Sequence, residues 1–208
     1  MTQEEWYQMR CGYLTASVAE DVCKRLKTGG KPKSYEDRLD SVLAERLTGE
    51  PIVTPPSQAM MWGKEHEAEA AEAYEIETGL SLLGNGEEFY PHPTIKWLGS
   101  SPDRLIVNSD GLVEIKCPNT LTHLERLRTH VIPDSYKRQM QVQLLCTGRK
   151  WVDFVDYDPR FSGPYMHLSL LILRYEPKDE ELRETERLCC QFLADVDEKL
   201  KEIESLEK

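Results

Sequence analysis

Two short stretches of alternating apolar residues, separated by a turn dipeptide, constrain the fold of this chain more than any other feature. Leu105–Asn108 and Leu112–Lys116 each alternate as a half-buried strand does, and the dipeptide Asp110-Gly111 between them is typical of a β-hairpin turn. Successive side chains of a strand point to opposite faces, so Glu114 and Lys116 share one face. The sequence therefore predicts an antiparallel hairpin that carries two charged groups on one side.

A third charged residue, Asp103, lies just before this hairpin and directly after Pro102. If the connecting loop has an even number of residues, Asp103 comes up on the face of Glu114, whereas a β-bulge would break this parity. Two converging carboxylates repel each other unless a cation lies between them, and hard oxygen ligands suit Mg²⁺, with Mn²⁺ as a possible substitute. We expect Asp103 and Glu114 to bind the ion, and the backbone carbonyl of Ile115 could supply another ligand.

A lysine beside such carboxylates points to a particular chemistry. The ammonium of Lys116 can hold an attacking water and offset the charge that builds on a phosphodiester in the transition state. Metal ions there polarise the phosphate, lower the pKa of the water and stabilise the leaving 3′-oxygen, so the pattern predicts phosphodiester hydrolysis. The same loose pattern also occurs by chance on exposed strand edges of acidic chains. The apolar strand residues around these charges favour a functional site, because a charged residue flanked by buried apolar residues needs a partner.

The composition bounds the class of protein. At 208 residues the chain fits one domain, residues 1–208, with a sizeable core. It has no apolar run of membrane-spanning length, and Met1–Glu5 lacks the basic and apolar regions of a signal peptide. We therefore expect a soluble cytoplasmic protein without a membrane partner. Six cysteines without C-x-x-C spacing or a paired histidine cluster predict neither structural zinc nor disulfides.

The charge is unevenly distributed. The net charge of −11 argues against a protein that coats nucleic acid indiscriminately, and residues 176–208 hold twelve acidic and six basic residues. By contrast, Lys24–Lys33 contains five cations and no anion. A second basic region is formed by Arg126, Arg128, Lys137, Arg138, Arg149 and Lys150. Either region could follow a phosphate backbone, although a solvated loop and helix faces are more often the correct explanation of any one such run.

Helical and strand patterns alternate along the rest of the chain. Capping-box signals at Thr2-x-x-Glu5 and Ser17-x-x-Glu20 predict helix starts in the first quarter. Further helices are predicted at Ser34–Leu47, Ser57–Thr78, Leu121–Thr129, Ser135–Thr147 and from Lys178 onward. Further strands are predicted at Leu80–Leu83, Glu87–Tyr90, Ile95–Gly99, Lys150–Tyr157 and Tyr165–Tyr175. The pattern predicts an α/β or α+β fold with a central mixed sheet flanked by helices.

Four segments, in order, resemble the lambda-exonuclease family of phage recombination nucleases, also called the YqaJ or alkaline-exonuclease group. They are Arg10–Ser17, Trp62–Glu67, Ser101–Asp103 with Gly111–Pro118, and Tyr136 with Gln141-Val-Gln143 followed by Trp151–Pro159. Together they span roughly residues 10 to 160, and four ordered motifs are far more specific than one. The resemblance implies a restriction-endonuclease-like core of the PD-(D/E)xK superfamily.

The same resemblance implies roles for further residues. Arg10, with Ser17 nearby, would grip a 5′-phosphate, for which a guanidinium, a hydroxyl and a helix N-terminus are suited. Glu67 of the Trp-Gly-x-x-x-Glu pattern would be an additional metal-site carboxylate. Gln141 and Gln143 lie about 200° apart on a helix, so only one can face the site, and the family pattern favours Gln141 near the scissile phosphate or the water. Helix capping and ordinary helix surface are the structural alternatives for these residues.

The leading hypothesis is a Mg²⁺-dependent exodeoxyribonuclease of linear double-stranded DNA. By resemblance it would digest one strand from 5′ to 3′, release 5′-mononucleotides and leave 3′ overhangs for recombination by single-strand annealing. The implied partners are DNA ends, two further copies of the chain in a ring-shaped homotrimer, and a single-strand annealing protein. The implied location is the cytoplasm of a bacterial host, as a phage or prophage protein.

Other functions remain open for the same fold. A structure- or sequence-specific endonuclease would cleave covalently closed circles. An iron–sulfur nuclease would need four suitably spaced cysteines, which this chain lacks. A non-catalytic scaffold that binds DNA ends would also fit, although the intact set of Asp103, Glu114 and Lys116 speaks against it.

Overall fold

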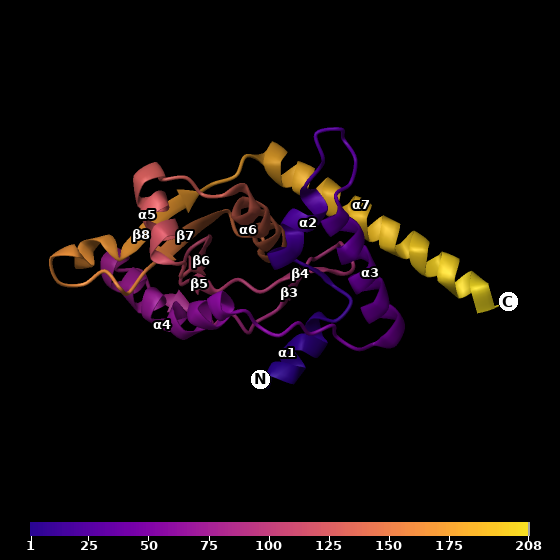
Figure 1. The fold of residues 1–208 in the computed structure, drawn as a ribbon, viewed down its shortest axis with the longest axis horizontal. Coiled ribbons are helices and arrows are strands. Elements are labelled where there is room, and N and C mark those ends of the chain that lie inside the picture. Colours follow the sequence, from indigo (N-terminus) through magenta and orange to yellow (C-terminus); the bar gives the residue numbers. More distant parts are fainter. Residues whose placement is uncertain (208) are drawn as a thin grey trace.

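The computed structural model describes residues 1–207, in which helices pack around two sheets and a long C-terminal helix extends to one side (Figure 1). The α-helices are α1 (Gln3–Arg10), α2 (Ala19–Cys23), α3 (Lys33–Thr48), α4 (Gln58–Thr78), α5 (Thr120–Thr129), α6 (Asp134–Thr147) and α7 (Asp179–Glu204). The 3₁₀-helices are η1 (Ala16–Val18), η2 (Gly163–Leu168) and η3 (Ser205–Glu207). The strands are β1 (Leu14–Thr15), β2 (Leu82–Leu83), β3 (Tyr90–Pro91), β4 (Leu98–Ser100), β5 (Arg104–Ile106), β6 (Gly111–Lys116), β7 (Trp151–Tyr157) and β8 (Leu170–Tyr175).

The larger sheet has five strands in the order β2-β5-β6-β7-β8. Strands β6 and β7 are parallel, whereas the pairs β2–β5, β5–β6 and β7–β8 are antiparallel. A smaller sheet, β1-β4-β3, has a parallel pair β1–β4 and an antiparallel pair β3–β4. This arrangement confirms the predicted mixed sheet flanked by helices.

Opposite faces of the larger sheet are covered by α4 and α6 (Figure 1). Ala70 and Tyr74 of α4 pack with Val113 of β6, whereas Met140 of α6 packs with Leu112. The strand therefore alternates as the sequence predicts, and its even-numbered side chains face α6. Each large apolar side chain that is fully buried contributes about 1.5–3 kcal/mol to this packing.

A third apolar cluster joins the smaller sheet to α2, α3, α6 and α7. Tyr35 of α3 and Phe192 of α7 lie at its centre, with their rings edge to face at 5.2 Å. This cluster holds the middle of α7, from Leu188 to Val196, while the end of α7 extends beyond it (Figure 1). Among residues 1–207, no helix is both long and apolar enough to cross a bilayer.

The best predicted helix is α4, because its ends are set by local chemistry. The Ser57 side chain accepts a hydrogen bond from the Met60 N–H at 3.2 Å, and Gly79 ends the helix with a φ of 69°. The capping box at Thr2 and Glu5 is also present. These signals lie in contiguous sequence, so they could be identified without tertiary information.

Two predicted element starts are wrong, and one strand was not predicted. Ser17 does not cap a helix, because it lies inside η1, and the N-cap of α2 is Val18 without a side-chain hydrogen bond. Leu14–Thr15 forms strand β1, which depends on pairing with β4. Strand β8 begins at Leu170 and not at Tyr165, because η2 occupies the start of that segment and includes Pro164, which has no N–H for a ladder.

The hairpin turn also differs from the prediction. The turn consists of Val107–Asp110, and Asn108 takes the positive φ of 53°. Gly111 belongs to β6, where a Cβ atom would lie 2.3 Å from the ring of Trp151. The glycine is therefore needed because an indole from the neighbouring strand covers it, and not because of a turn.

Candidate active site

The hairpin β5–β6 brings Asp103 and Glu114 together. Arg104 pairs with Val113, so the next step of the same register sets Asp103 opposite Glu114. Directly opposite residues of an antiparallel pair share a face, with Cβ atoms about 4.5–5.5 Å apart. Asp103 is held by the backbone of β6, because its Oδ2 accepts a hydrogen bond from the Ile115 N–H at 2.7 Å. The parity expected from the sequence is present.

Glu114 is completely buried and is held by three side-chain donors. Lys116 forms an ion pair with it from the same strand. Gln139 donates to Oε1 and Gln143 to Oε2 through their amide nitrogens, each at 2.5 Å. Because both oxygens are bonded, the orientation of this carboxylate is fixed by α6.

The prediction that Gln141 faces the site is wrong. Its Nε2 donates to the Tyr175 hydroxyl and its Oε1 accepts from Thr185, each at 2.5 Å, on another face of α6. Only one of Gln141 and Gln143 faces Glu114, as helical geometry requires, and it is Gln143. Gln139 was missed, although residues four apart lie on one helix face and the pair 139 and 143 has that spacing.

Glu67 reaches the same region from α4, which packs on the opposite face of the sheet. Its Oε1 forms an ion pair with Arg104 at 2.7 Å, and its Oε2 lies 3.5 Å from Lys64. A Cβ atom on Gly86 would lie 3.8 Å from Glu67 Oε1 and 3.9 Å from Asp103 Oδ1. The glycine loop therefore borders both carboxylates. Arg104 was not predicted, although it directly follows Asp103.

Negative charge is crowded at this site. Burial, together with the negative charges of Glu114 and Glu67, raises the pKa of Asp103 to about 7, although Lys116 lowers it. Burial alone would lower the pKa of Lys116, but Glu114 and Asp103 outweigh it and raise the pKa. One lysine thus faces a pair of carboxylates whose charges are incompletely balanced.

The donor set fits a magnesium ion. No group of three or more His, Cys, Asp or Glu side chains within residues 1–207 forms an ion site by itself. Mg²⁺ does not need one, because it is usually held by one or two carboxylates, several waters and substrate phosphates. The excess negative charge on Asp103 and Glu114 suits a cation, whereas Arg104 already balances Glu67. A ligand role for the Ile115 carbonyl stays a prediction.

Arg10 is docked against the segment that leads to Asp103. Its Nη1 donates to Ser101 Oγ at 3.0 Å, and its guanidinium carbon lies 4.0 Å from the ring centre of Trp6. Burial lowers its pKa to about 10, and no carboxylate among residues 1–207 forms an ion pair with it. Ser17 is exposed and contacts Thr15 at 3.3 Å, so the contacts bring Arg10, but not Ser17, to the Asp103 segment.

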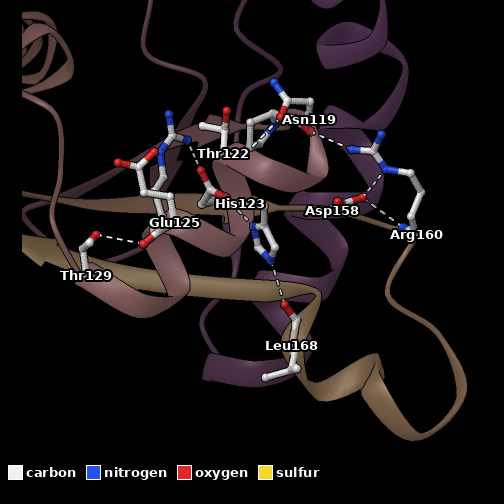
Figure 2. Close-up of polar contacts among 11 residues, drawn as sticks. Asn119, Thr122, His123, Glu125, Thr129, Asp158, Arg160 and Leu168 are labelled. Atoms are coloured by element: carbon white, nitrogen blue, oxygen red, sulfur yellow. Dashed lines mark hydrogen bonds and ion pairs between the residues drawn. The ribbon is translucent and has the colours of Figure 1, made fainter.

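A buried polar network lies beside Lys116 in the sheet. In the parallel register of β6 and β7, Lys116 pairs with Asp156 of β7, which binds both His123 and Arg126 of α5. The other ring nitrogen of His123 points to the Leu168 carbonyl at 2.7 Å (Figure 2). Both ring nitrogens thus meet acceptors, which only the imidazolium can satisfy. Burial would lower the pKa of His123, but its hydrogen bonds to Asp156 and Leu168 raise it.

Comparisons with known proteins identify the family of the chain. A YqaJ-like viral recombinase domain matches residues 5–150. The chain belongs to this family. Among curated proteins, none gives a significant match.

Solved structures related to this YqaJ-like chain extend the comparison to its whole length. An alkaline exonuclease, LHK-Exo from Laribacter hongkongensis, is 35% identical, covers 99% of this chain and 98% of its own, and has a TM-score of 0.88. The same protein in complex with dAMP has a TM-score of 0.87. A phage-related exonuclease from Haemophilus somnus 129PT is 14% identical, with 92% and 96% coverage and a TM-score of 0.68, which shows the fold alone. The YqaJ-like chain is an enzyme of the exodeoxyribonuclease class with the alkaline-exonuclease fold.

Proposed function

We propose that the YqaJ-like chain is a Mg²⁺-dependent exonuclease that digests one strand of linear duplex DNA from 5′ to 3′. The observation that carries the proposal is the pair of half-buried Asp103 and buried Glu114, crowded by negative charge and accompanied by Lys116. The dAMP complex of the 35% identical exonuclease supports a 5′-mononucleotide as the product. The remaining strand would then be a 3′ overhang.

In this proposal each polar group at the site has a separate task. Asp103 and Glu114 would hold Mg²⁺, which when bound would polarise the scissile phosphate and activate water for attack. Lys116 orients that water and offsets the negative charge of the transition state. Gln139 and Gln143 keep Glu114 oriented through its two oxygens. Glu67, balanced by Arg104, borders the site from α4.

The direction of digestion is assigned to Arg10. Its guanidinium is largely desolvated, lacks a carboxylate partner in the described chain and is tied to Ser101, two residues before Asp103. A phosphate is a better partner for such a group than water, because guanidinium–phosphate hydrogen bonds are charge-assisted and can be bidentate. A 5′-phosphate bound there would set the reacting end of the strand beside the carboxylates. Ser17 is the proposed second contact.

The proposed assembly is a ring-shaped homotrimer that encloses DNA and hands its 3′ overhang to a single-strand annealing protein. Such a ring would let an acidic subunit track DNA, with the basic segment Lys24–Lys33 facing the channel and the acidic residues facing outward. The proposed setting is phage or prophage recombination in a bacterial cytoplasm. Sedimentation of the purified chain measures the trimer directly.

Linear duplex DNA, labelled at either the 5′ or the 3′ end, tests the main proposal. With Mg²⁺, the 5′ label should appear first as a labelled mononucleotide, and chelator should stop the reaction. Early release of the 3′ label would contradict the polarity. Cleavage of a closed circle would favour the endonuclease, and binding of DNA ends without hydrolysis would favour the scaffold.

Lys116→Ala tests the chemistry of the site. The variant should lose hydrolysis by at least a hundredfold, because a single charge-stabilising group is worth about 10²–10³ in rate. Lys150→Ala is the matched control, because Lys150 is exposed and pairs with Asp110 on the surface. Turnover by Lys116→Ala at the rate of the control would contradict the assigned role.

A further inference from the structure

Two basic segments that lie far apart in the sequence line one cavity. The cavity has a volume of about 350 Å³ and lies where the end of α2, the first turns of α6 and the start of α7 meet. Lys24 and Arg25 come from the first basic segment, and Lys137 and Arg138 from the second. The fold thus gathers four cations that the sequence leaves in unrelated places.

Three carboxylates also line the cavity, and they offset the charge of the four cations only in part. Asp134 is paired with Lys137 at 3.0 Å, and Glu181 accepts a hydrogen bond from the backbone N–H of Lys178 at 2.9 Å. Glu184, nearby on α7, is held by Arg187. Glu20 is the remaining carboxylate of the lining.

The cations retain donors for a ligand. Arg25 donates through Nη1 to the backbone carbonyls of Val22 and Lys24, at 2.7 and 2.8 Å. Arg138 donates through Nη1 to Gln141 and Thr185. Among residues 1–207, no carboxylate forms an ion pair with Lys24, Arg25 or Arg138. Three cations therefore stand against two carboxylates, Glu20 and Glu181, and each guanidinium has further N–H groups available.

The position of the cavity on α6 indicates the kind of anion. Residues 134, 137, 138 and 141 form the face of α6 toward the cavity, while the neighbouring residue Gln139 donates to Glu114 of the candidate active site. The two sites are therefore separated by about one helix diameter, roughly 10 Å. Phosphates follow each other every 3.4 Å of axial rise along one strand, so this distance is about three nucleotides.

We propose that Lys24, Arg25, Lys137 and Arg138 form a phosphate-binding pocket for the backbone of the DNA that occupies the active site. This inference rests on the proposed nuclease function and adds a second anchoring point on the far side of α6. Guanidinium groups match phosphate geometry and lysines add charge, so the pocket binds the backbone without reading sequence. Gln141 supports it indirectly, because its side chain holds Arg138 at 3.2 Å.

The experiment measures DNA binding without turnover. Binding of labelled duplex with a 3′ overhang is measured in chelator at several salt concentrations, for the wild-type chain, Lys24→Ala/Lys137→Ala and the control Lys199→Ala/Lys201→Ala. The control removes the same charge from the exposed end of α7. Each lost phosphate contact lowers the slope of log K against log salt by about 0.9 for duplex and about 0.7 for single strands. We expect a slope lower by about 1 to 2 for the pocket variant and no change for the control.

The outcomes separate this proposal from the nuclease function. Equal salt slopes for the pocket variant and the control, in a protein that still digests linear DNA, would overturn the pocket and leave the function intact. Failure of the wild-type chain to bind or digest any DNA would overturn both. The thermal shift with inorganic phosphate and with a mononucleotide is measured in parallel. A shift that the pocket variant loses, while its DNA binding is unchanged, would assign the pocket to free anions and not to the backbone.

Discussion

Replacing Asp103 by asparagine should stabilise the protein in the absence of metal while removing its activity. The carboxylate is placed among like charges, and its pKa moves from the ordinary value of 3.8 to about 7. One pKa unit corresponds to about 1.4 kcal/mol, so ionised Asp103 destabilises the metal-free fold by about 4 kcal/mol. Asparagine keeps an oxygen for the Ile115 N–H, and the weaker neutral hydrogen bond offsets about 1 kcal/mol.

The expected net gain of about 3 kcal/mol corresponds to a rise in Tm of roughly 6–12 °C for a domain of this size. The sign depends on pH. An acid whose pKa is raised by folding imposes no penalty below its unfolded pKa, and the penalty grows as the pH rises through the folded pKa. The difference between Asp103→Asn and the wild-type chain should therefore be largest above about pH 7 and vanish near pH 4.

Thermal unfolding followed by circular dichroism, in chelator and then with added Mg²⁺, measures both effects. Asp40→Asn is the matched control, because Asp40 is exposed on α3 and far in sequence from the site. Mg²⁺ should raise the Tm of the wild-type chain and of the control more than that of Asp103→Asn, because a cation removes the repulsion. If Asp103→Asn were no more stable than the control at about pH 8 in chelator, the proposed crowding of charge would be refuted.

Three further substitutions test other parts of the structure. Gln143→Leu should lower the rate of DNA hydrolysis by about 10–100-fold, because Glu114 loses a hydrogen bond that orients it. Gln141→Leu should mainly lower the free energy of unfolding, by about 1–3 kcal/mol, because it removes the hydrogen bond to Tyr175. Equal activities of the two variants would contradict the conclusion that Gln143, and not Gln141, faces the site. Gly111→Ala should cost about 1–3 kcal/mol, because the new methyl group would overlap the Trp151 ring, and an unchanged Tm would show that the ring moves freely. Because folding raises the pKa of His123, its stabilisation is complete below about pH 6.5 and is lost as the pH rises through the folded pKa. Urea unfolding between pH 6 and 9 should therefore show a loss of stability that His123→Gln lacks.

The candidate site shows where sequence reasoning works and where it stops. Asp103 and Glu114 could be placed on one face because the period of a strand is fixed by covalent geometry, and the hairpin between them is short. The prediction that Gln141 faces the site was wrong because the helical period shows only that Gln141 and Gln143 cannot both face it. The period does not show which face of the helix meets the sheet. That face is set by Met140 and its contacts in the core, which turn Gln139 and Gln143 toward Glu114.

Sequence alone determined the elements whose signals are local: α4 between its Ser57 cap and Gly79, and the strand that carries Glu114 and Lys116. Only the tertiary structure decided which distant groups meet them. Arg10 reaches Ser101, and the basic residues that follow α2 share a cavity with those of α6. The physical reason is that backbone periodicity acts over a few residues, whereas these contacts depend on how whole helices pack against the sheets.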